Sequence, residues 1–166
     1  MTGPSLPPTS GDAAVDGVLA ASKALVGVAA RSLAALGDDE LTLAQYRVLL
    51  LVVEGRARAP GDLATLLEVH PSNATRVVDR LVAKGLLERD ATEGDRRVVS
   101  LAATPSGRAT VGRVLRHRRR IIEEILADLG PGETEVIGSA LARFAEAAGE
   151  VADVPSDDAW RLGWGS

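Results

Sequence analysis

The segment HPSNATRVVDRLVAKGLLERDATEGDRRVVSLAATPSG, residues 70–107, joins a helix with two different faces to a basic β-hairpin. Its first half repeats apolar residues at helical spacing, at Ala74, Val77, Val78, Leu81 and Val82. The other side of this helix carries Ser72, Asn73, Thr75, Arg76, Asp79 and Arg80. After Gly85, the apolar runs LLERD and VVSLA flank the polar turn ATEGDRR, which is typical of a hairpin with a projecting tip. The segment therefore predicts a helix that can touch base edges beside a charged hairpin.

Positive charge is concentrated in and after this segment, although the whole chain is acidic. The chain has 19 Lys and Arg against 23 Asp and Glu, a net charge of -4. Residues 76–120 alone carry 12 basic and 5 acidic side chains, a net charge of +7, so the remainder carries -11. Because phosphate binding depends on the local potential, the acidic total is compatible with a nucleic-acid partner. It argues against sequence-blind coating of DNA.

Length and composition favour a folded, mostly helical protein. Of the 166 residues, 46% are hydrophobic and only 2% are aromatic, which suits closely packed helices. The absence of cysteine excludes disulfides, thiolate catalysis and cysteine metal sites. Residues 1–12 lack the basic start and apolar run of a secretion signal, and we expect no stretch apolar enough to span a bilayer. These features predict a cytoplasmic protein that does not associate with membranes.

The N-terminal part of the chain divides into a tail and a helix. Residues 1–11 are rich in Pro, Ser, Thr and Gly and are predicted to be disordered. A helix is predicted over residues 12–36, ended by Gly37, because apolar residues recur there at spacings of three and four. Since this helix has few polar residues, we expect it to pack against a partner chain. The alternative is a helix buried wholly within the monomer.

Two shorter helices are predicted before the charged segment. Thr42 is a good N-cap for a helix that stops at Gly55. We expect the RARA segment, residues 56–59, to add an edge strand to the hairpin and make a three-stranded sheet. Pro60 then opens a short helix, whose expected core residues are Leu63, Ala64, Leu66 and Leu67. Helix, turn, helix and hairpin together define a winged helix-turn-helix over residues 42–104.

Two further helices follow the hairpin. The Thr104 hydroxyl can cap a helix in which Pro105 occupies a position that needs no donor, and a Gly-Pro-Gly break separates this long helix from a last one. Because the two helices have little core between them, we expect residues 105–150 to join residues 12–36 in a helical dimerisation platform. Residues 151–166, with two tryptophans, are predicted to be a tail. The expected fold is mainly α with a small β-hairpin wing.

The first turns of the helix in the charged segment contain the side chains expected to read DNA. Asparagine suits adenine, arginine suits guanine and the threonine methyl group suits thymine. The candidate base readers are Ser72, Asn73, Thr75 and Arg76, and Arg80, one turn later, is expected to meet phosphate. The alternative for Ser72 and Asn73 is simple helix capping, because both residue types are strong caps at a helix start.

Four motifs in this order resemble the MarR family of bacterial transcriptional regulators: LTLAQYRVL at 41–49, DRLVAKGLLERD at 79–90, DRR at 95–97 and LAATPSGR at 101–108. The resemblance covers residues 12–149. It implies a homodimeric repressor that binds a pseudo-palindromic operator in double-stranded DNA. It also implies release from DNA by a small ligand, often aromatic or anionic.

The resemblance assigns roles to the hairpin tip. Arg97 matches the family position that reaches into the minor groove, and Arg96 is expected to contact the adjacent backbone. Asp95 is expected to hold an arginine in an extended pose through a charge-assisted hydrogen bond. The alternative is a solvated charged turn.

A second basic cluster comprises Arg116, Arg118, Arg119 and Arg120, which point in different directions on a helix. The cluster is expected either to line a cleft for an anionic effector or to form surface salt bridges. By resemblance to the family, Tyr46 is a candidate pocket wall, and its alternative is a core position. The candidate ligand-binding residues are therefore Tyr46, Arg116 and Arg120.

No metal, cofactor or catalytic site is predicted. His70 and His117 are the only histidines, and their spacing to nearby carboxylates matches no metal-ligand pattern. Glu123 and Glu124 are adjacent on a helix and diverge, so they do not form a catalytic pair. We therefore expect a DNA-binding regulator rather than an enzyme. The alternative function is an effector-independent winged-helix module for DNA architecture or protein association.

Overall fold

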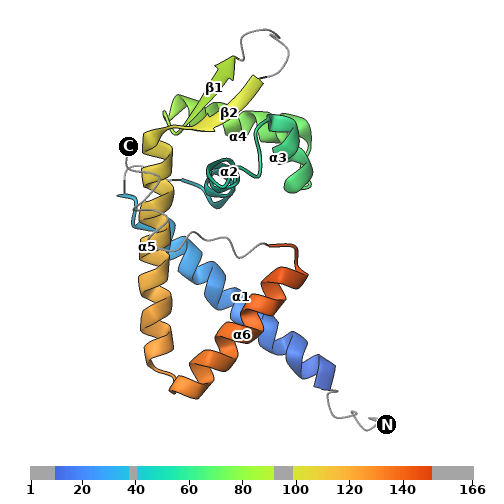
Figure 1. Cartoon of the computed structure of the whole chain (residues 1–166), viewed down its shortest axis with the longest axis vertical. Coiled ribbons are helices and arrows are strands. Elements are labelled where there is room, and N and C mark those ends of the chain that lie inside the picture. Colours follow the sequence, from blue (N-terminus) through green and yellow to red (C-terminus); the bar gives the residue numbers. More distant parts are fainter. Residues whose placement is uncertain (1–9, 38–40, 92–98, 151–166) are drawn as a thin grey trace, which may run out of the picture.

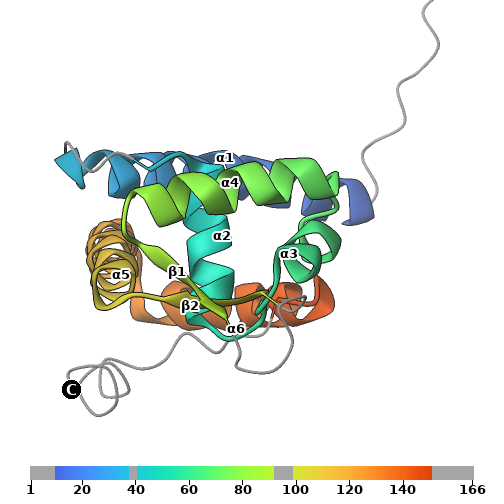
Figure 2. The ribbon, with the colours of Figure 1, turned by 90° about the horizontal axis from the view of Figure 1, so that it is seen from above.

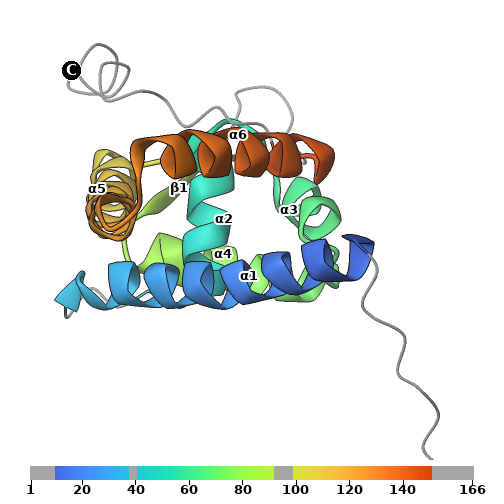
Figure 3. The same cartoon turned by 90° about the horizontal axis from the view of Figure 1, so that it is seen from below.

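The computed structural model describes residues 10–37, 41–91 and 99–150, which form six helices and one two-stranded sheet (Figure 1). The elements are α1 Ser10–Ala34, α2 Leu43–Val53, α3 Pro60–Leu66, α4 Pro71–Ala83, β1 Leu87–Ala91, β2 Val99–Ala103, α5 Pro105–Ala127 and α6 Pro131–Ala147. The helices α2 to α4 and the hairpin gather at one end, and α5 leads from the hairpin to the other. Figures 2 and 3 show α1 and α6 running along opposite sides of the molecule.

The described elements confirm the predicted mainly helical fold with a hairpin. Residues 10 and 11, which were predicted to belong to the disordered tail, are part of α1. The rest of that predicted tail, and the whole of the predicted tail 151–166, lie outside the described residues.

Two threonines start helices as predicted. Thr42 Oγ1 accepts from the backbone N–H of Gln45 at 3.2 Å, and Gln45 Oε1 accepts from the Thr42 N–H at 3.0 Å. Thr104 Oγ1 accepts from the Gly107 N–H at 3.0 Å and also donates to the Gly85 carbonyl at 2.7 Å. This second bond ties the start of α5 to the residues that follow α4.

The apolar face of α4 lies in the core, as its spacing predicted. Ala74, Val78 and Leu81 are buried, and Val77 and Val82 pack against the same core at partial burial. The elements that pack against this face are α2, α3 and β1. Burial of a Val or Leu side chain contributes about 1.5–3 kcal/mol to stability, so this face fixes the orientation of α4 and holds its polar face outward.

The short helix α3 differs in part from its predicted core face. Leu63 and Ala64 are buried and Leu67 packs against the core, but Leu66 is exposed. At 3.6 residues per turn, positions 63, 64 and 67 share one side of a helix, and position 66 falls outside that side. The prediction of Leu66 as a core residue was wrong.

The predicted third strand at residues 56–59 does not form. In the part of the chain that the structure describes, the sheet has two strands. Among these described residues, one backbone hydrogen bond joins β2 to residues 56–59: the Leu101 N–H donates to the Arg58 carbonyl at 2.7 Å. Asp62 Oδ2 accepts from the Arg58 and Ala59 N–H groups at 2.8 and 2.9 Å. Because Asp62 takes these two donors to start α3, they are not available for a strand ladder.

Helix α1 is largely uncovered in the single chain, which excludes its complete burial within the monomer. Its exposed large apolar residues are Val15, Val18, Leu19, Leu25 and Val26. The segment Gly11–Ala34 is long and apolar enough to cross a membrane, and very little of it is buried in the single chain. The expectation that the chain has no such stretch was wrong, because charged residues are too sparse in this helix to interrupt its apolar run. A helix that packs against another protein chain can have the same length and composition.

Candidate nucleic-acid interface and ligand cavity

The predicted base-reading residues lie together on the exposed face of α4. Ser72, Asn73, Thr75, Arg76 and Arg80 are all exposed, opposite the buried apolar face. Figure 2 looks onto the end of the molecule that holds α4 and the hairpin, the two elements nearest the viewer. The fold therefore presents this polar face outward beside the hairpin.

The cap of α4 is His70, a residue whose capping role the sequence reading missed. His70 Nδ1 accepts from the Ser72 N–H at 3.3 Å and lies 2.9 Å from Ser72 Oγ. Ser72 and Asn73 follow Pro71 inside the first turn, so the capping alternative for these two residues is wrong. Their side chains are on the outer surface of the helix.

Side chains on this face are linked along the helix. Arg76 donates to the side-chain oxygen of Asn73 through Nη2, and its Nε donates to the Ser72 carbonyl at 3.3 Å. Thr75 Oγ1 donates to the Pro71 carbonyl at 3.0 Å. These contacts hold the Arg76 guanidinium against the first turn of α4, close to the Asn73 amide.

An ion pair joins the hairpin to α4. Arg89 on β1 pairs with Asp79 on α4. The strands β1 and β2 are antiparallel, with Leu87 opposite Ala103 at one end and Ala91 opposite Val99 at the other. The hairpin tip continues from that second end. Asp95, Arg96 and Arg97, the predicted wing contacts, lie outside the described residues.

Tyr46 lines a cavity of about 630 Å³ between α1, α2 and α5. The lining residues are Ala29, Leu43, Ala44, Tyr46, Arg47, Leu50 and Arg118. Tyr46 is 2% exposed, and Arg118 lies over its ring, with the guanidinium carbon 5.5 Å from the ring centroid. Burial raises the pKa of the Tyr46 hydroxyl, and the Arg118 charge partly offsets this rise. The tyrosine is therefore both a core residue and a cavity wall.

Two polar atoms in this region are buried without a hydrogen-bond partner among the described residues. They are the Tyr46 hydroxyl oxygen and Arg118 Nε. An unpaired buried donor is costly, and arginine and tyrosine donors both suit a carboxylate or another anion. The apolar walls and these donors give the cavity the properties of a site for an anionic aromatic compound.

The structure separates the predicted ligand-binding residues into two cavities. Arg116 and Arg120 line a different cavity of about 420 Å³, together with Ser32, Ala35, Leu36, Arg113 and His117. Residues two apart on a helix differ by about 200°, so Arg118 faces away from Arg116 and Arg120. Arg118 is thus the arginine that accompanies Tyr46, and the sequence reading did not assign it to the ligand site. Arg119 forms the expected kind of surface salt bridge, with Glu123 at 2.8 Å.

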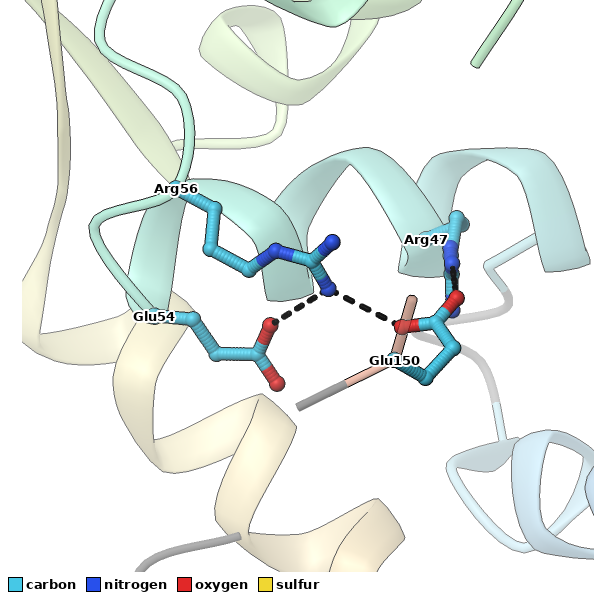
Figure 4. Close-up of polar contacts among 4 residues, drawn as sticks. All are labelled: Arg47, Glu54, Arg56 and Glu150. Atoms are coloured by element: carbon cyan, nitrogen blue, oxygen red, sulfur yellow. Dashed lines mark hydrogen bonds and ion pairs between the residues drawn. The ribbon is translucent and has the colours of Figure 1, made fainter. Parts of the chain in front are cut away.

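A cluster of charged side chains connects α2 and the turn after it to Glu150, shortly beyond the end of α6 (Figure 4). Glu150 accepts from Arg47 and, at 2.9 Å, from Arg56, and Arg56 also lies 3.9 Å from Glu54. Hydrogen bonds from Arg47 and Arg56 lower the pKa of Glu150, whereas burial raises that of Glu54. This cluster was not predicted from the sequence, because Glu150 is far from Arg47, Glu54 and Arg56 in the chain.

Among the residues that the structure describes, no group of three or more His, Cys, Asp or Glu side chains is arranged to hold a metal ion.

Comparisons with known proteins agree with this architecture. The sequence model of the MarR family matches residues 39–98. The chain is 32% identical over 108 residues to the HTH-type transcriptional repressor MdtR of Bacillus subtilis, covering 65% of this chain and 70% of MdtR.

Solved structures extend the similarity to most of the chain. RV1404 from Mycobacterium tuberculosis is 37% identical with a TM-score of 0.76, over 89% of this chain and 100% of RV1404. The YusO protein from Bacillus subtilis is 26% identical with a TM-score of 0.64, over 84% of this chain and 99% of YusO.

Proposed function

The chain belongs to the MarR family of DNA-binding transcriptional regulators, and we propose that it acts as a homodimeric repressor that binds a pseudo-palindromic operator. The observation that carries this proposal is the exposed polar face of α4, held outward by the buried apolar face on its other side. The family and the similar proteins are transcriptional regulators rather than enzymes.

The proposed major-groove contacts come from the first two turns of α4. Asn73 can pair with adenine and Arg76 with guanine. The Ser72 hydroxyl can form a hydrogen bond with either of these bases, and the Thr75 methyl group suits thymine. Arg80 lies one turn further along and suits a phosphate. These five residues are exposed on the same helix face, which supports a common role.

The proposed minor-groove contact comes from the hairpin tip. The family resemblance assigns Arg97 to the groove, Arg96 to the adjacent backbone and Asp95 to the positioning of an arginine. The ion pair between Arg89 and Asp79 supports this role, because it joins the middle of β1 to α4.

We propose that residues 12–36 and 105–150 form the dimer and that residues 42–104 bind DNA. Helix α6 has no buried residue in the single chain, and its Val136 and Phe144 are 68% and 53% exposed. With the exposed apolar residues of α1, these side chains form a surface that a second copy can cover.

The charged residues of α1 are Asp12, Asp16, Lys23 and Arg31. Because each is costly in a bilayer core, a cytoplasmic dimer accounts for α1 better than a membrane span.

We further propose that a small anionic aromatic ligand binds in the Tyr46 cavity and releases the repressor from DNA. The Tyr46 hydroxyl and Arg118 Nε support this site, since neither has a hydrogen-bond partner among the described residues and both could gain one. The other cavity, with Arg116 and Arg120, is the alternative anion site, favoured by its three arginines and the absence of a carboxylate among its lining residues.

Selection of bound sequences from a random DNA pool, followed by footprinting at a stated salt concentration, tests the regulator function. We expect protection of an inverted repeat whose half-sites lie about one helical turn apart. Protection without sequence preference would contradict it and favour the effector-independent architectural module. A subsequent screen of small anions for release of the selected operator tests the ligand response.

A further inference from the structure

Arg47 belongs to two sites at once. Its side chain lines the Tyr46 cavity, and its guanidinium also pairs with Glu150 after the end of α6 (Figure 4). It sits on α2, which packs against α4 and α5. Arg47 therefore lies between the proposed ligand site and a contact that connects α6 to the DNA-binding region.

We propose that Glu150 and an anionic ligand in the Tyr46 cavity compete for the Arg47 guanidinium, so that ligand binding loosens the end of α6 from α2. This inference rests on the proposed ligand response and adds the route by which the cavity acts on the rest of the molecule. The ligand class it requires is an aromatic carboxylate or a similar flat anion.

The composition of the cavity makes Arg47 an accessible partner for such a ligand. The described residues that line it include two arginines, Arg47 and Arg118, and no carboxylate. A carboxylate whose ring packs on the apolar walls would lie in a cavity that both arginines line. Arg118 lies over the Tyr46 ring, so Arg47 is the guanidinium that would have to change partners.

The contact with Glu150 is of a kind that exchanges readily. The Arg47 and Glu150 side chains are 42% and 41% exposed, and ion pairs in such surroundings are weak because water screens them. Glu150 also keeps its second partner, Arg56, at 2.9 Å when Arg47 leaves. When Arg47 exchanges Glu150 for the ligand, the contact between α2 and Glu150 is therefore weakened, but the Glu150 carboxylate still has a partner.

Loosening this contact has a consequence for DNA binding because α6 makes few other contacts with the part of the chain that the structure describes. None of its residues is buried, while α2 is part of the main core with α4. The Glu150 cluster is thus a polar tie between the proposed dimerisation helices and the helix that supports α4. Losing part of it lets the α4 helices of a dimer change their separation, which must match the half-site spacing.

Calorimetric titration of the full-length protein with benzoate, and with benzamide as the neutral analogue, tests the competition. We expect Glu150→Gln to bind benzoate about twofold to fivefold more tightly than the wild type, the effect of removing one exposed ion pair. Glu146→Gln, a matched change on α6, should bind benzoate as the wild type does. Benzamide affinity should be the same in all three proteins.

A double-mutant cycle assigns the effect to Arg47. In an Arg47→Gln background, the preference for benzoate over benzamide should fall and the additional Glu150→Gln change should have no effect on benzoate affinity. Operator binding is the second readout: Glu150→Gln should lower the affinity without ligand and reduce the further loss that benzoate causes.

The outcomes separate this inference from the proposed function. Benzoate binding that weakens in Arg118→Gln but is unchanged in Glu150→Gln would overturn the competition and leave the ligand site in place. An effect of Glu150→Gln that persists without Arg47 would overturn it as well. If benzoate binds neither the wild type nor Glu150→Gln, the anion site in this cavity fails together with the inference, while operator selection still tests the DNA-binding role.

Discussion

Replacing Tyr46 with phenylalanine removes one buried hydroxyl and leaves the ring in place. The side chain is 2% exposed, and its hydroxyl has no hydrogen-bond partner among the described residues. A buried polar group without a partner lowers the free energy of unfolding by about 1–3 kcal/mol. We expect the Tyr46→Phe variant to be more stable by about 1 kcal/mol, the lower end of this range.

Calorimetric unfolding of the ligand-free protein measures this difference. For a chain of this length, 1 kcal/mol corresponds to a rise in Tm of about 2–4 °C. All variants must be compared at one protein concentration, because the Tm of a dimer depends on concentration. A Tyr46→Leu variant is the control: it loses ring packing and should unfold at a lower temperature than the wild type. A lower Tm for Tyr46→Phe would refute the reasoning, since it would mean that the hydroxyl has a partner.

The same substitution changes the dependence of stability on pH. Burial raises the pKa of Tyr46 above its ordinary value, and the Arg118 charge opposes this only in part. In the unfolded chain a tyrosine loses its proton near pH 10, so above this pH the unfolded state binds fewer protons than the folded state. The wild type should therefore lose stability as the pH rises above about 10, and Tyr46→Phe should lack this part of the loss. Equal slopes in the two proteins would contradict it.

Arg76→Ala should weaken operator binding by about 1–3 kcal/mol in an anisotropy titration, the discrimination that a bidentate arginine–guanine pair supplies. Arg119→Ala, which loses only an exposed pair within α5, is its control and should bind normally. Arg97→Ala should weaken binding by about 1–3 kcal/mol without changing dimer dissociation in sedimentation, and unchanged binding across a salt titration would exclude the wing contact. Gly107→Ala should lower the free energy of unfolding by about 2–3 kcal/mol, because a Cβ there would overlap the Leu86 carbonyl oxygen. A wild-type Tm for this variant would mean that α5 can move away.

Features that depend on neighbouring residues could be predicted from the sequence. The buried and exposed faces of α4 follow from the 3.6-residue period, and the helix starts at Thr42 and Thr104 follow from hydroxyl caps that bond within three residues. Even here, local competition matters. The RARA segment has the pattern of an edge strand, but Asp62 binds its N–H groups to begin α3.

Features that depend on distant parts of the chain could not be predicted. Arg47 and Glu150 are 103 residues apart, and no pattern in either segment indicates that they meet. The basic cluster on α5 predicts a charged site. Which of its arginines lies beside Tyr46 depends on the packing of α5 against α2, which places Arg118 there. Likewise, a window of apolar residues in α1 does not reveal whether a core, a membrane or a second chain covers it.

The Tyr46 hydroxyl, which lacks a partner among the described residues, links ligand affinity to the stability of the ligand-free protein. A carboxylate that bonds to the Tyr46 hydroxyl removes the same unfavourable burial that Tyr46→Phe removes. The variant that gains stability should therefore lose ligand affinity by a comparable free energy, since both effects come from one hydroxyl. If Arg47 must also leave Glu150 when the ligand binds, Glu150→Gln should raise the ligand affinity. This substitution should leave the surroundings of the Tyr46 hydroxyl almost unchanged. The ligand affinities of the two variants therefore separate two free energies. One is gained when the ligand pairs with the Tyr46 hydroxyl, and the other is lost when the contact between Arg47 and Glu150 is broken.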